Sequence, residues 1–380
     1  MEVVAIPAPP FGEQARAKWL AGQFVDAGLS DVLTDDIGNV LGFLYPGSHD
    51  VESTGHIVVV SAHLDTVFPA GTLIQPSLTR KDDADRLEAP GACDNGAGIA
   101  GLLALAHALV HGEVDPPLPL LFVGNVGEEG EGDLRGVRHL YGSPLAGRIA
   151  AHIVLDGAGA DSAVTQALGS RRFQVTICGP GGHSFTDAGT PNPIAALATA
   201  LAALNKTPVP DEPRTTMNLG TIHGGTSVNS IPERAVASID FRSTSADELL
   251  RLEVALHRAV EDAVEFANAH APSVAARGKL VFTIRKIGDR PAAQLPHDSP
   301  ILEALRAVDR RLDLKTTVRL GSTDANVPLS LNIPAVSVGA GGDGGGAHTL
   351  GEWYSAKDRE LGLKRALLLT LAMLDWAAEQ

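Results

Sequence analysis

The chain has 380 residues, more than one ordinary hydrophobic core accommodates, so two domains are expected. Apolar residues make up 44% of the sequence and charged residues 20%, a balance typical of a folded globular protein and not of a disordered one. The formal net charge is −15 and the basic residues are scattered, so a phosphate backbone would be repelled and no nucleic-acid partner is expected.

The cysteines and the N-terminal stretch indicate the cellular setting. Cys93 and Cys178 are the only two cysteines and cannot form a disulfide framework, which fits a reducing, cytoplasmic setting. The stretch MEVVAIPAPPFGE lacks the basic and apolar regions of a signal peptide. The longest apolar helical segment, near 99–110, is too short to cross a bilayer, so no membrane partner is expected.

The first part of the chain has the pattern of alternating helices and buried strands. Apolar residues at helical spacing predict a helix over 13–28, and a short strand follows near 40–44. The apolar run at 57–61 predicts a strand buried on both faces, as in a parallel sheet covered by helices. A Gly-rich turn then leads into an apolar helix within 91–109. Further strands and a last helix are expected at 118–125, 151–155, 334–339 and 356–378.

The strand at 57–61 leads into His63 and Asp65, which can take part in metal binding. Residues two apart in an extended backbone point to the same side, so both side chains leave the strand end together. Open α/β sheets bind ligands at the carboxyl ends of their strands, and a carboxylate there can orient a metal-ligating histidine. A single His-x-Asp is also compatible with a structural histidine near a turn.

Other strand ends carry similar groups. Glu128 and Glu129 follow the strand at 118–125, Asp156 follows the next strand, and His348 lies in the Gly-rich loop after the last one. Asp94 stands where a helix begins, where an aspartate can also serve only as an N-cap. Because several separate segments deliver acidic and imidazole groups to one edge of a sheet, the sequence predicts a metal site.

Between Arg171 and Ile287 the pattern changes to strand, helix, strand, strand, helix and strand. These elements are expected at 171–179, 192–204, 215–225, 234–242, 245–270 and 279–287. The βαββαβ order predicts a ferredoxin-like module inserted into an α/β domain. We therefore expect one domain formed by residues 1–170 and 288–380 and a second formed by residues 171–287.

Taken together and in this order, several motifs resemble the dinuclear zinc metallopeptidase and deacylase family, which includes peptidase T, carboxypeptidase G, succinyl-diaminopimelate desuccinylase and the aminoacylases. The motifs are SAHLDTV (61–67), GACDNGAG (91–98), GEEG (127–130), VLDG (154–157), GGHS (181–184), GGTSVNSIP (224–232), DFR (240–242), GSTDA (321–325) and GGAHT (345–349). The resemblance covers nearly the whole chain and implies a zinc-binding catalytic sheet domain, with helices on both faces, and an inserted lid or dimerisation domain. One departure is Asn95, which stands where the family usually has a lysine-containing Gly-rich segment.

The resemblance implies two zinc ions per subunit, with cobalt or manganese as possible alternatives. The implied ligands are Asp94 as the bridge, Glu129 and His348 for one ion, and His63 and Asp156 for the other. A carboxylate suits the bridging role because its two oxygens can each bind one cation.

The resemblance also implies roles for residues that do not bind zinc. Asp65 would orient a histidine ligand, and Glu128 would be the general base that activates a zinc-bound hydroxide. His183 would stabilise the oxyanion, from the same chain or from a partner subunit. Asn229 and Arg242 would bind the substrate carbonyl and terminal carboxylate. Alternatively, His183 is a solvent-facing turn residue and Arg242 a surface residue at a strand end.

The implied reaction is hydrolysis of an amide bond next to an amino-acid carbonyl or carboxylate. In the family pattern, an aspartate at the third ligand position, here Asp156, favours a peptidase T-like aminopeptidase or tripeptidase that acts on short peptides. The resemblance also implies a homodimer that associates through the inserted domain. The alternatives within the family are an N-acyl-amino-acid amidohydrolase of the deacetylase or desuccinylase type and a carboxypeptidase. An alternative of another class is a catalytically inactive binding protein on the same fold.

Overall fold

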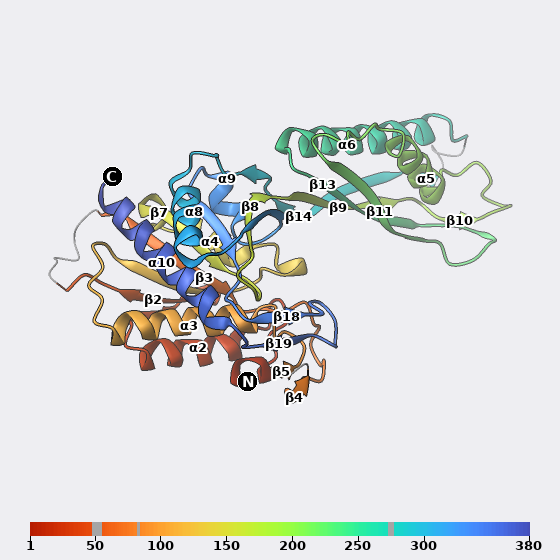
Figure 1. Cartoon of the computed structure of the whole chain (residues 1–380). Helices are drawn as coiled ribbons and strands as arrows, with labels where there is room; N and C mark the ends of the chain where they lie inside the picture. The colour runs from red at the N-terminus through yellow and green to blue at the C-terminus, as the bar shows by residue number, and fades with distance from the viewer. Residues whose placement is uncertain (48–54, 82–83, 273–276) are drawn as a thin grey trace. The chain divides into compact units, whose positions relative to one another are not determined.

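A computed structural model describes residues 1–47, 55–81, 84–272 and 277–380 (Figure 1). Its contacts divide the chain into two units. The first unit comprises Met1–Ala167 and Gln294–Gln380, and the second comprises Leu168–Ala293. The boundaries expected from the sequence, 171 and 287, are close to those of the second unit.

The first unit is built on a mixed sheet with strand order β1-β2-β6-β3-β7-β17-β8-β15, in which β16 also pairs with β8. The central strands β6, β3, β7 and β17 are parallel, so their carboxyl ends lie at one edge. The strands β1 and β2 on one side and β8 on the other are antiparallel to their inner neighbours. The strands are β1 (Ser30–Thr34), β2 (Val40–Leu44), β3 (Ile57–His63), β6 (Leu120–Asn125), β7 (Ile149–Leu155), β8 (Ser162–Ala167), β15 (Ala293–Gln294), β16 (Thr317–Gly321) and β17 (Ala335–Val338).

Helices cover both faces of this sheet, as the fully buried β3 and β6 require. Successive residues of a strand point to opposite faces. On one face Leu121 and Val123 pack in a cluster with Leu140 of α4, and on the other Phe122 meets Phe24 of α2, with ring centroids 6.4 Å apart. The helices are α1 (Glu2–Ala5), α2 (Gln14–Asp26), α3 (Gly96–His111), α4 (Arg135–Gly142), α8 (Pro300–Leu312), α9 (Asn326–Ser330) and α10 (Arg359–Ala378), with short 3-10 turns η1 (Gly130–Gly132) and η2 (Ala146–Arg148).

A buried ion pair attaches α10 to α8. Arg365 is fully buried and donates from Nε and one terminal nitrogen to the two carboxylate oxygens of Asp309, at 2.8 and 3.3 Å. Its other terminal nitrogen donates to the carbonyl of Ser162 at 2.9 Å. These bonds satisfy a charge that burial would otherwise make costly.

A second, four-stranded sheet in the first unit was not predicted from the sequence. Its order is β18-β19-β5-β4, and all its pairs are antiparallel. The strands are β4 (Ser77–Lys81), β5 (Ala84–Glu88), β18 (Asp343–Gly345) and β19 (Trp353–Ser355). The polar stretch 70–90 has no apolar alternation because β4 is largely exposed and β5 is half-buried, and β5 pairs with β19, far along the chain.

The second unit has the element order that the sequence predicts. A four-stranded antiparallel sheet of order β11-β13-β9-β14 is accompanied by α5 and α6, and a short pair, β10 and β12, lies outside it. The elements are β9 (Gly169–Cys178), β10 (Gly182–His183), α5 (Pro193–Leu204), β11 (Thr215–Gly224), β12 (Ser230–Ile231), β13 (Arg234–Ser243), α6 (Ala246–Ala269) and β14 (Val281–Arg290).

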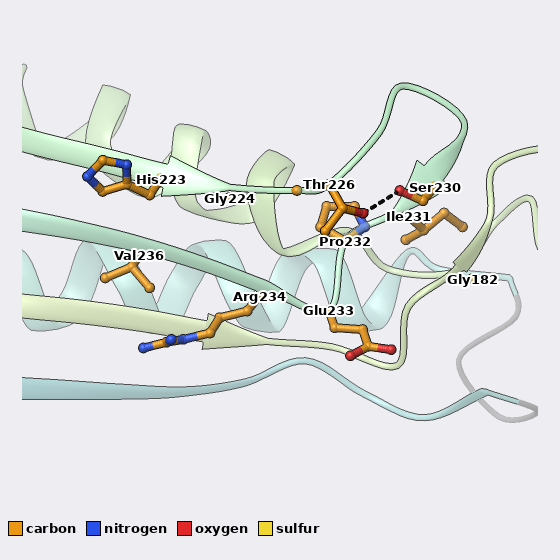
Figure 2. A pocket seen from close by; sticks show the side chains of 11 residues that line it. Gly182, His223, Gly224, Thr226, Ser230, Ile231, Pro232, Glu233, Arg234 and Val236 are labelled. Carbon is orange, nitrogen blue, oxygen red and sulfur yellow. Dashed lines mark hydrogen bonds between the residues drawn. The ribbon is translucent and has the colours of Figure 1, made fainter.

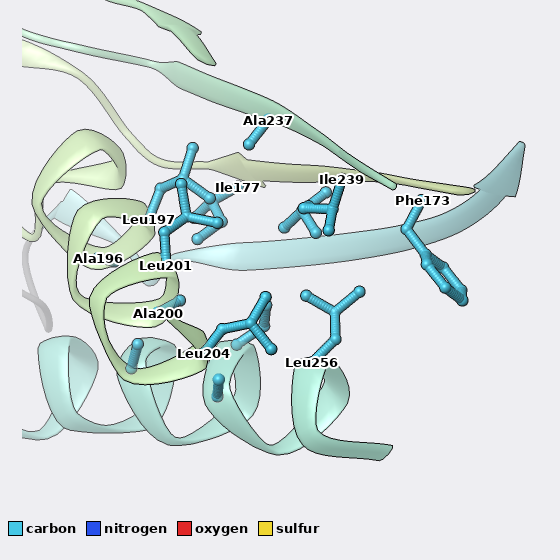
Figure 3. Packing of buried hydrophobic residues seen from close by; sticks show 14 of the residues in the cluster. Phe173, Ile177, Ala196, Leu197, Ala200, Leu201, Leu204, Ala237, Ile239 and Leu256 are labelled. Atoms are coloured by element: carbon cyan, nitrogen blue, oxygen red, sulfur yellow. The ribbon is translucent and has the colours of Figure 1, made fainter. Parts of the chain in front are cut away.

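The second unit has its own hydrophobic core between the sheet and its two helices (Figure 3). Leu197 and Leu201 of α5 and Leu256 of α6 face Ile177 and Ile239 of the sheet. The regular Ala/Leu spacing within 192–204 is thus explained by packing of α5 in this core.

Among the described helices, none combines the length and apolarity that crossing a bilayer requires. Cys93 and Cys178 are both free thiols.

Truncating Leu256 to alanine should destabilise the protein by about 2–5 kcal/mol, because the side chain is fully buried and a cavity would remain. The measurement is urea-induced unfolding of the full chain. Leu250→Ala on the same helix is the matched control, since Leu250 is 53% exposed, and it should change stability by less than about 0.5 kcal/mol. Equal effects of the two substitutions would contradict the packing described for α6.

Candidate metal centre

The carboxyl ends of the parallel strands carry the residues that the sequence singles out. His63 is the last residue of β3, and Asp156 directly follows β7. Glu129 lies in the turn after β6, and His348 in the loop between β18 and β19. Asp94 precedes α3. The structure brings these five residues together within the first unit.

Asp94 lies between two histidines. Its Oδ1 is 3.0 Å from Nε2 of His63, and its Oδ2 is 3.0 Å from Nε2 of His348. The two oxygens of one carboxylate therefore face one imidazole each. This is the arrangement expected of a carboxylate that bridges two cations.

The remaining carboxylates divide between the two histidines. Asp156 Oδ1 lies 3.7 Å from His63 Nε2, and Glu129 Oε1 lies 3.2 Å from His348 Nε2. The grouping is the one that the sequence resemblance implies for two metal ions. Independently, donor atoms of His63, Asp94 and Glu129 all lie within 4.8 Å of one another, a group that could hold one ion.

The chemistry of this donor set fits divalent cations. Asp94 Oδ1 is buried and makes no hydrogen bond to any residue that the structure describes, although it faces an imidazole nitrogen. A cation between these atoms would satisfy that oxygen. Imidazole nitrogens with carboxylate oxygens are a donor set that zinc, cobalt and manganese all accept.

The site has a strongly negative potential. Asp94 and then Glu129 raise the pKa of His348 to about 10. Burial opposes the charged form of His63, but the carboxylates of Asp156, Asp65 and Asp94 together raise its pKa well above the usual value. In turn His348 and His63 outweigh burial and hold the pKa of Asp94 below its usual range. Carboxylates that draw protons onto nearby imidazoles in this way equally favour metal cations.

Asp65 joins two parts of the site. Its two carboxylate oxygens accept the backbone N–H groups of Glu128 and Glu129, at 2.9 and 2.8 Å. Nδ1 of His63 lies closer to the Asp65 carbonyl oxygen, 3.1 Å, than to the carboxylate, 3.7 Å. The backbone carbonyl of Asp65, and not its carboxylate, is thus the group within hydrogen-bond distance of His63, while the carboxylate fixes the backbone of the Glu128–Glu129 turn.

The turn that carries Glu128 is closely packed. Gly127 has φ +66°, and a Cβ there would lie 2.6 Å from the Arg135 side chain, so only glycine fits. Asn39 accepts the N–H of Val126 at 3.0 Å. Glu128 is buried and lies directly before the candidate ligand Glu129.

Asn95, the departure from the family pattern, connects Asp94 to the strand that precedes Asp156. Its Oδ1 caps α3 through the N–H of Gly98 and accepts the N–H of Gly157, both at 3.1 Å. Its Nδ2 donates to the carbonyl of Leu155 at 2.9 Å. The N-cap role considered for Asp94 belongs to Asn95.

Sequence reasoning missed two buried carboxyl groups close to these residues. Glu352 is fully buried and accepts N–H groups of the turn that carries Asp94. Asp324 is also fully buried, accepts a hydrogen bond from Asn125 at 2.6 Å, and has its pKa raised to about 7 by burial. The GSTDA motif contained Asp324, but no sequence signal distinguished Glu352 from an exposed acidic residue near a turn.

The structure places His183 and Asn229 side by side in the second unit. β10 pairs with β12 so that His183 lies opposite Ser230, and the N–H of Ser184 donates to the Asn229 carbonyl at 3.0 Å. Both residues are exposed. Nδ1 of His183 accepts the N–H groups of Phe185 and Thr186, so a neutral His183 carries its proton on Nε2.

Arg242 lies near the opposite end of the second unit's sheet from these loops. It pairs with Ser170 and Thr216, whereas Arg234 at the start of the same strand pairs with Cys178. Its Nε donates to Asp240 at 2.8 Å, and the side chain is 43% exposed. A role in binding a substrate carboxylate stays a prediction.

A pocket of about 610 Å³ opens beside the loop that carries Asn229 (Figure 2). Its walls include His223, Thr226, Ser230, Glu233 and Arg234, and Thr226 and Ser230 are joined by a hydroxyl–hydroxyl hydrogen bond of 3.2 Å. His223 and Arg234 lie at the ends of β11 and β13, Ser230 lies in β12, and Thr226 and Glu233 lie in the adjoining loops.

Residues 59–372 match the sequence profile of peptidase family M20/M25/M40. The chain therefore belongs to this family, and the family resemblance found in the motifs is confirmed.

Among curated proteins, a probable carboxypeptidase of Aspergillus clavatus is 30% identical over 253 residues, which is 61% of this chain and 54% of that protein. The chain spans about half the length of the curated relatives it matches.

Two solved structures show the same fold. The aminopeptidase PepT of Bacillus cereus has a TM-score of 0.75 at 20% identity and covers 98% of this chain and 96% of its own. A dinuclear metal-binding peptidase of the M20 family from Bacillus subtilis has a TM-score of 0.67 at 15% identity, with 98% and 96% covered. The α/β fold expected from the sequence is thereby confirmed.

Replacing Asp94 with asparagine should remove at least one bound metal ion per chain, because an amide offers one oxygen where a bridge needs two. The measurement is metal content after equilibration with zinc and removal of excess, by plasma mass spectrometry. Asp85→Asn, at a side chain 77% exposed, is the control and should leave the content unchanged. Full metal content in Asp94→Asn would contradict the bridging geometry.

Proposed function

We propose that this protein is a metal-dependent hydrolase that cleaves amide bonds of short peptides, as an aminopeptidase or tripeptidase. The observation that carries the proposal is the Asp94 carboxylate between His63 and His348, with Glu128 in the adjoining turn. The shared fold with an aminopeptidase supports a peptide substrate.

The proposed metal content is two divalent cations, zinc or else cobalt or manganese. Asp94 would bridge them, with His63 and Asp156 holding one and Glu129 and His348 the other. When bound, such cations polarise a carbonyl oxygen and lower the pKa of a coordinated water towards about 7. Their positive charge would also offset the repulsion among the three carboxylates.

Glu128 is the proposed general base. It would take a proton from the attacking water and return it to the leaving amine, the two steps that amide hydrolysis requires of one carboxylate. Its backbone N–H is held by Asp65, so the turn that presents it is fixed before substrate binds.

His183 is the proposed donor to the oxyanion. Because its Nδ1 accepts two backbone N–H groups, its Nε2–H is available to donate to a developing negative charge. Asn229 and Arg242 are the proposed contacts to the substrate carbonyl and terminal carboxylate; a guanidinium can donate two parallel hydrogen bonds to a carboxylate.

A carboxypeptidase is the second candidate, because the curated relatives are probable carboxypeptidases. It uses the same site and differs in which end of the peptide is recognised. An N-acyl-amino-acid amidohydrolase would differ from a carboxypeptidase only in removing an acyl group from the amino acid.

We further propose a cytoplasmic homodimer that associates through the second unit. The two free thiols support a reducing compartment. Strand β11 forms an edge of the second unit's sheet and is exposed along most of its length, which suits pairing with a second copy. Sedimentation equilibrium of the full chain tests the dimer, and a monomer at micromolar concentration would refute it.

Glu128→Gln should lower kcat by about 10²–10⁴-fold, because glutamine cannot accept and return the proton, while metal content stays at the wild-type level. Steady-state kinetics and metal analysis on the same preparation provide the test. Glu131→Gln, an exposed residue nearby, is the control and should retain full activity. Undiminished turnover in Glu128→Gln would remove the base assignment.

A substrate panel should separate the candidates. We expect the metal-loaded protein to release the N-terminal residue from unblocked tripeptides faster than it hydrolyses N-blocked dipeptides or N-acetyl and N-succinyl amino acids. Mass spectrometry of the products identifies the bond cut. Turnover of only the N-blocked peptides would favour the carboxypeptidase, turnover of only the acyl amino acids the amidohydrolase, and none at all a binding protein.

A further inference from the structure

Glu352 accepts three backbone hydrogen bonds from the turn that carries Asp94. Its Oε1 accepts the N–H groups of Cys93 and Asp94, at 2.8 and 2.7 Å, and its Oε2 accepts the N–H of Gly91 at 2.8 Å. The side chain is fully buried. Hydrogen bonds to an ionised acceptor are about twice as strong as neutral ones, so this carboxylate fixes the turn firmly.

Glu352 belongs to the same loop as His348, which lies between β18 and β19. The loop is closed by hydrogen bonds from Thr349 N–H to the Gly346 carbonyl and from Glu352 N–H to the Thr349 carbonyl, at 3.0 and 3.2 Å. One short loop thus contacts Asp94 twice: Glu352 holds its backbone N–H, and His348 faces its carboxylate.

Burying another carboxylate close to Asp94 is costly unless the backbone that it holds matters to the site. It adds negative charge where Asp94, Asp156 and Glu129 already lie, and a neutral carbonyl could accept the same N–H groups. Asp65 provides a parallel, because it too is a buried carboxylate that accepts backbone N–H groups, those of Glu128 and Glu129.

We propose that Glu352 is a positioning residue of the metal centre, which sets the placement of His348 relative to Asp94 before any cation binds. The inference rests on the proposed function in so far as it takes these two residues to be ligands. Glu352 does not itself face a cation in this account; it acts through the Gly91–Asp94 backbone. Residues that orient metal ligands in this way are typically worth 10–100-fold in metal affinity.

The test is Glu352→Gln, which keeps the size of the side chain but replaces one accepting oxygen with an NH₂ group that cannot accept. Zinc affinity, measured by competition with a chromophoric chelator, should fall about 10–100-fold. The visible spectrum of the cobalt-loaded protein should shift, and the amides of Gly91, Cys93 and Asp94 should exchange faster with deuterium in the metal-free protein. Glu352→Asp, which keeps the charge, should recover part of the affinity, and it carries the test if the glutamine variant does not fold.

Asp309→Asn is the matched control, because it also removes the charge of a buried carboxylate of the first unit, one that pairs with Arg365. It should lower stability and leave zinc affinity unchanged. Wild-type zinc affinity and an unchanged cobalt spectrum in the Glu352 variants would overturn the inference, as would an equal loss in Asp309→Asn. Absence of zinc binding in the wild type would instead refute the proposed function on which the inference rests.

Discussion

The contact on which the first unit depends is that of one carboxylate, Asp94, with two imidazoles, one at each oxygen. Three carboxylates at the end of a sheet repel one another, and they draw protons onto the two neighbouring histidines unless other positive charge is present. Two observations reflect this excess of negative charge: the raised pKa of His348, and the buried Oδ1 of Asp94, which faces His63 without a hydrogen bond to any residue that the structure describes. Cations would satisfy both, and the polar residues around the site are arranged to hold their ligands in place.

The fold brings these charged side chains together through the placement of its backbone. Parallel strands buried on both faces bring His63 and the residues after β6 and β7 to one edge, and the loop between β18 and β19 adds His348. The turns at that edge are then held by side chains that accept backbone N–H groups: Asp65 for the Glu128–Glu129 turn and Glu352 for the Asp94 turn. The second unit takes no part in these contacts, and its sheet and two helices enclose a separate core.

Much of this arrangement could be predicted from the sequence, because strong signals are local. The run at 57–61 indicated a doubly covered strand, and the histidine and acidic residues after successive strands indicated one site. The sheet of β4, β5, β18 and β19 could not be predicted, since its strands are short or exposed and β5 pairs with β19 across more than 250 positions of chain. Glu352 was missed for the same reason: its three partners are distant in sequence, and a buried carboxylate has no pattern of its own.

A crystal structure of the zinc-loaded protein, with anomalous data on both sides of the zinc absorption edge, would test the bridging role of Asp94. Two anomalous peaks are expected on either side of its carboxylate, each within about 2.0–2.2 Å of one of its oxygens. One should also contact His63 and Asp156, and the other Glu129 and His348. Zinc bound elsewhere, or no peak beside Asp94, would contradict that role.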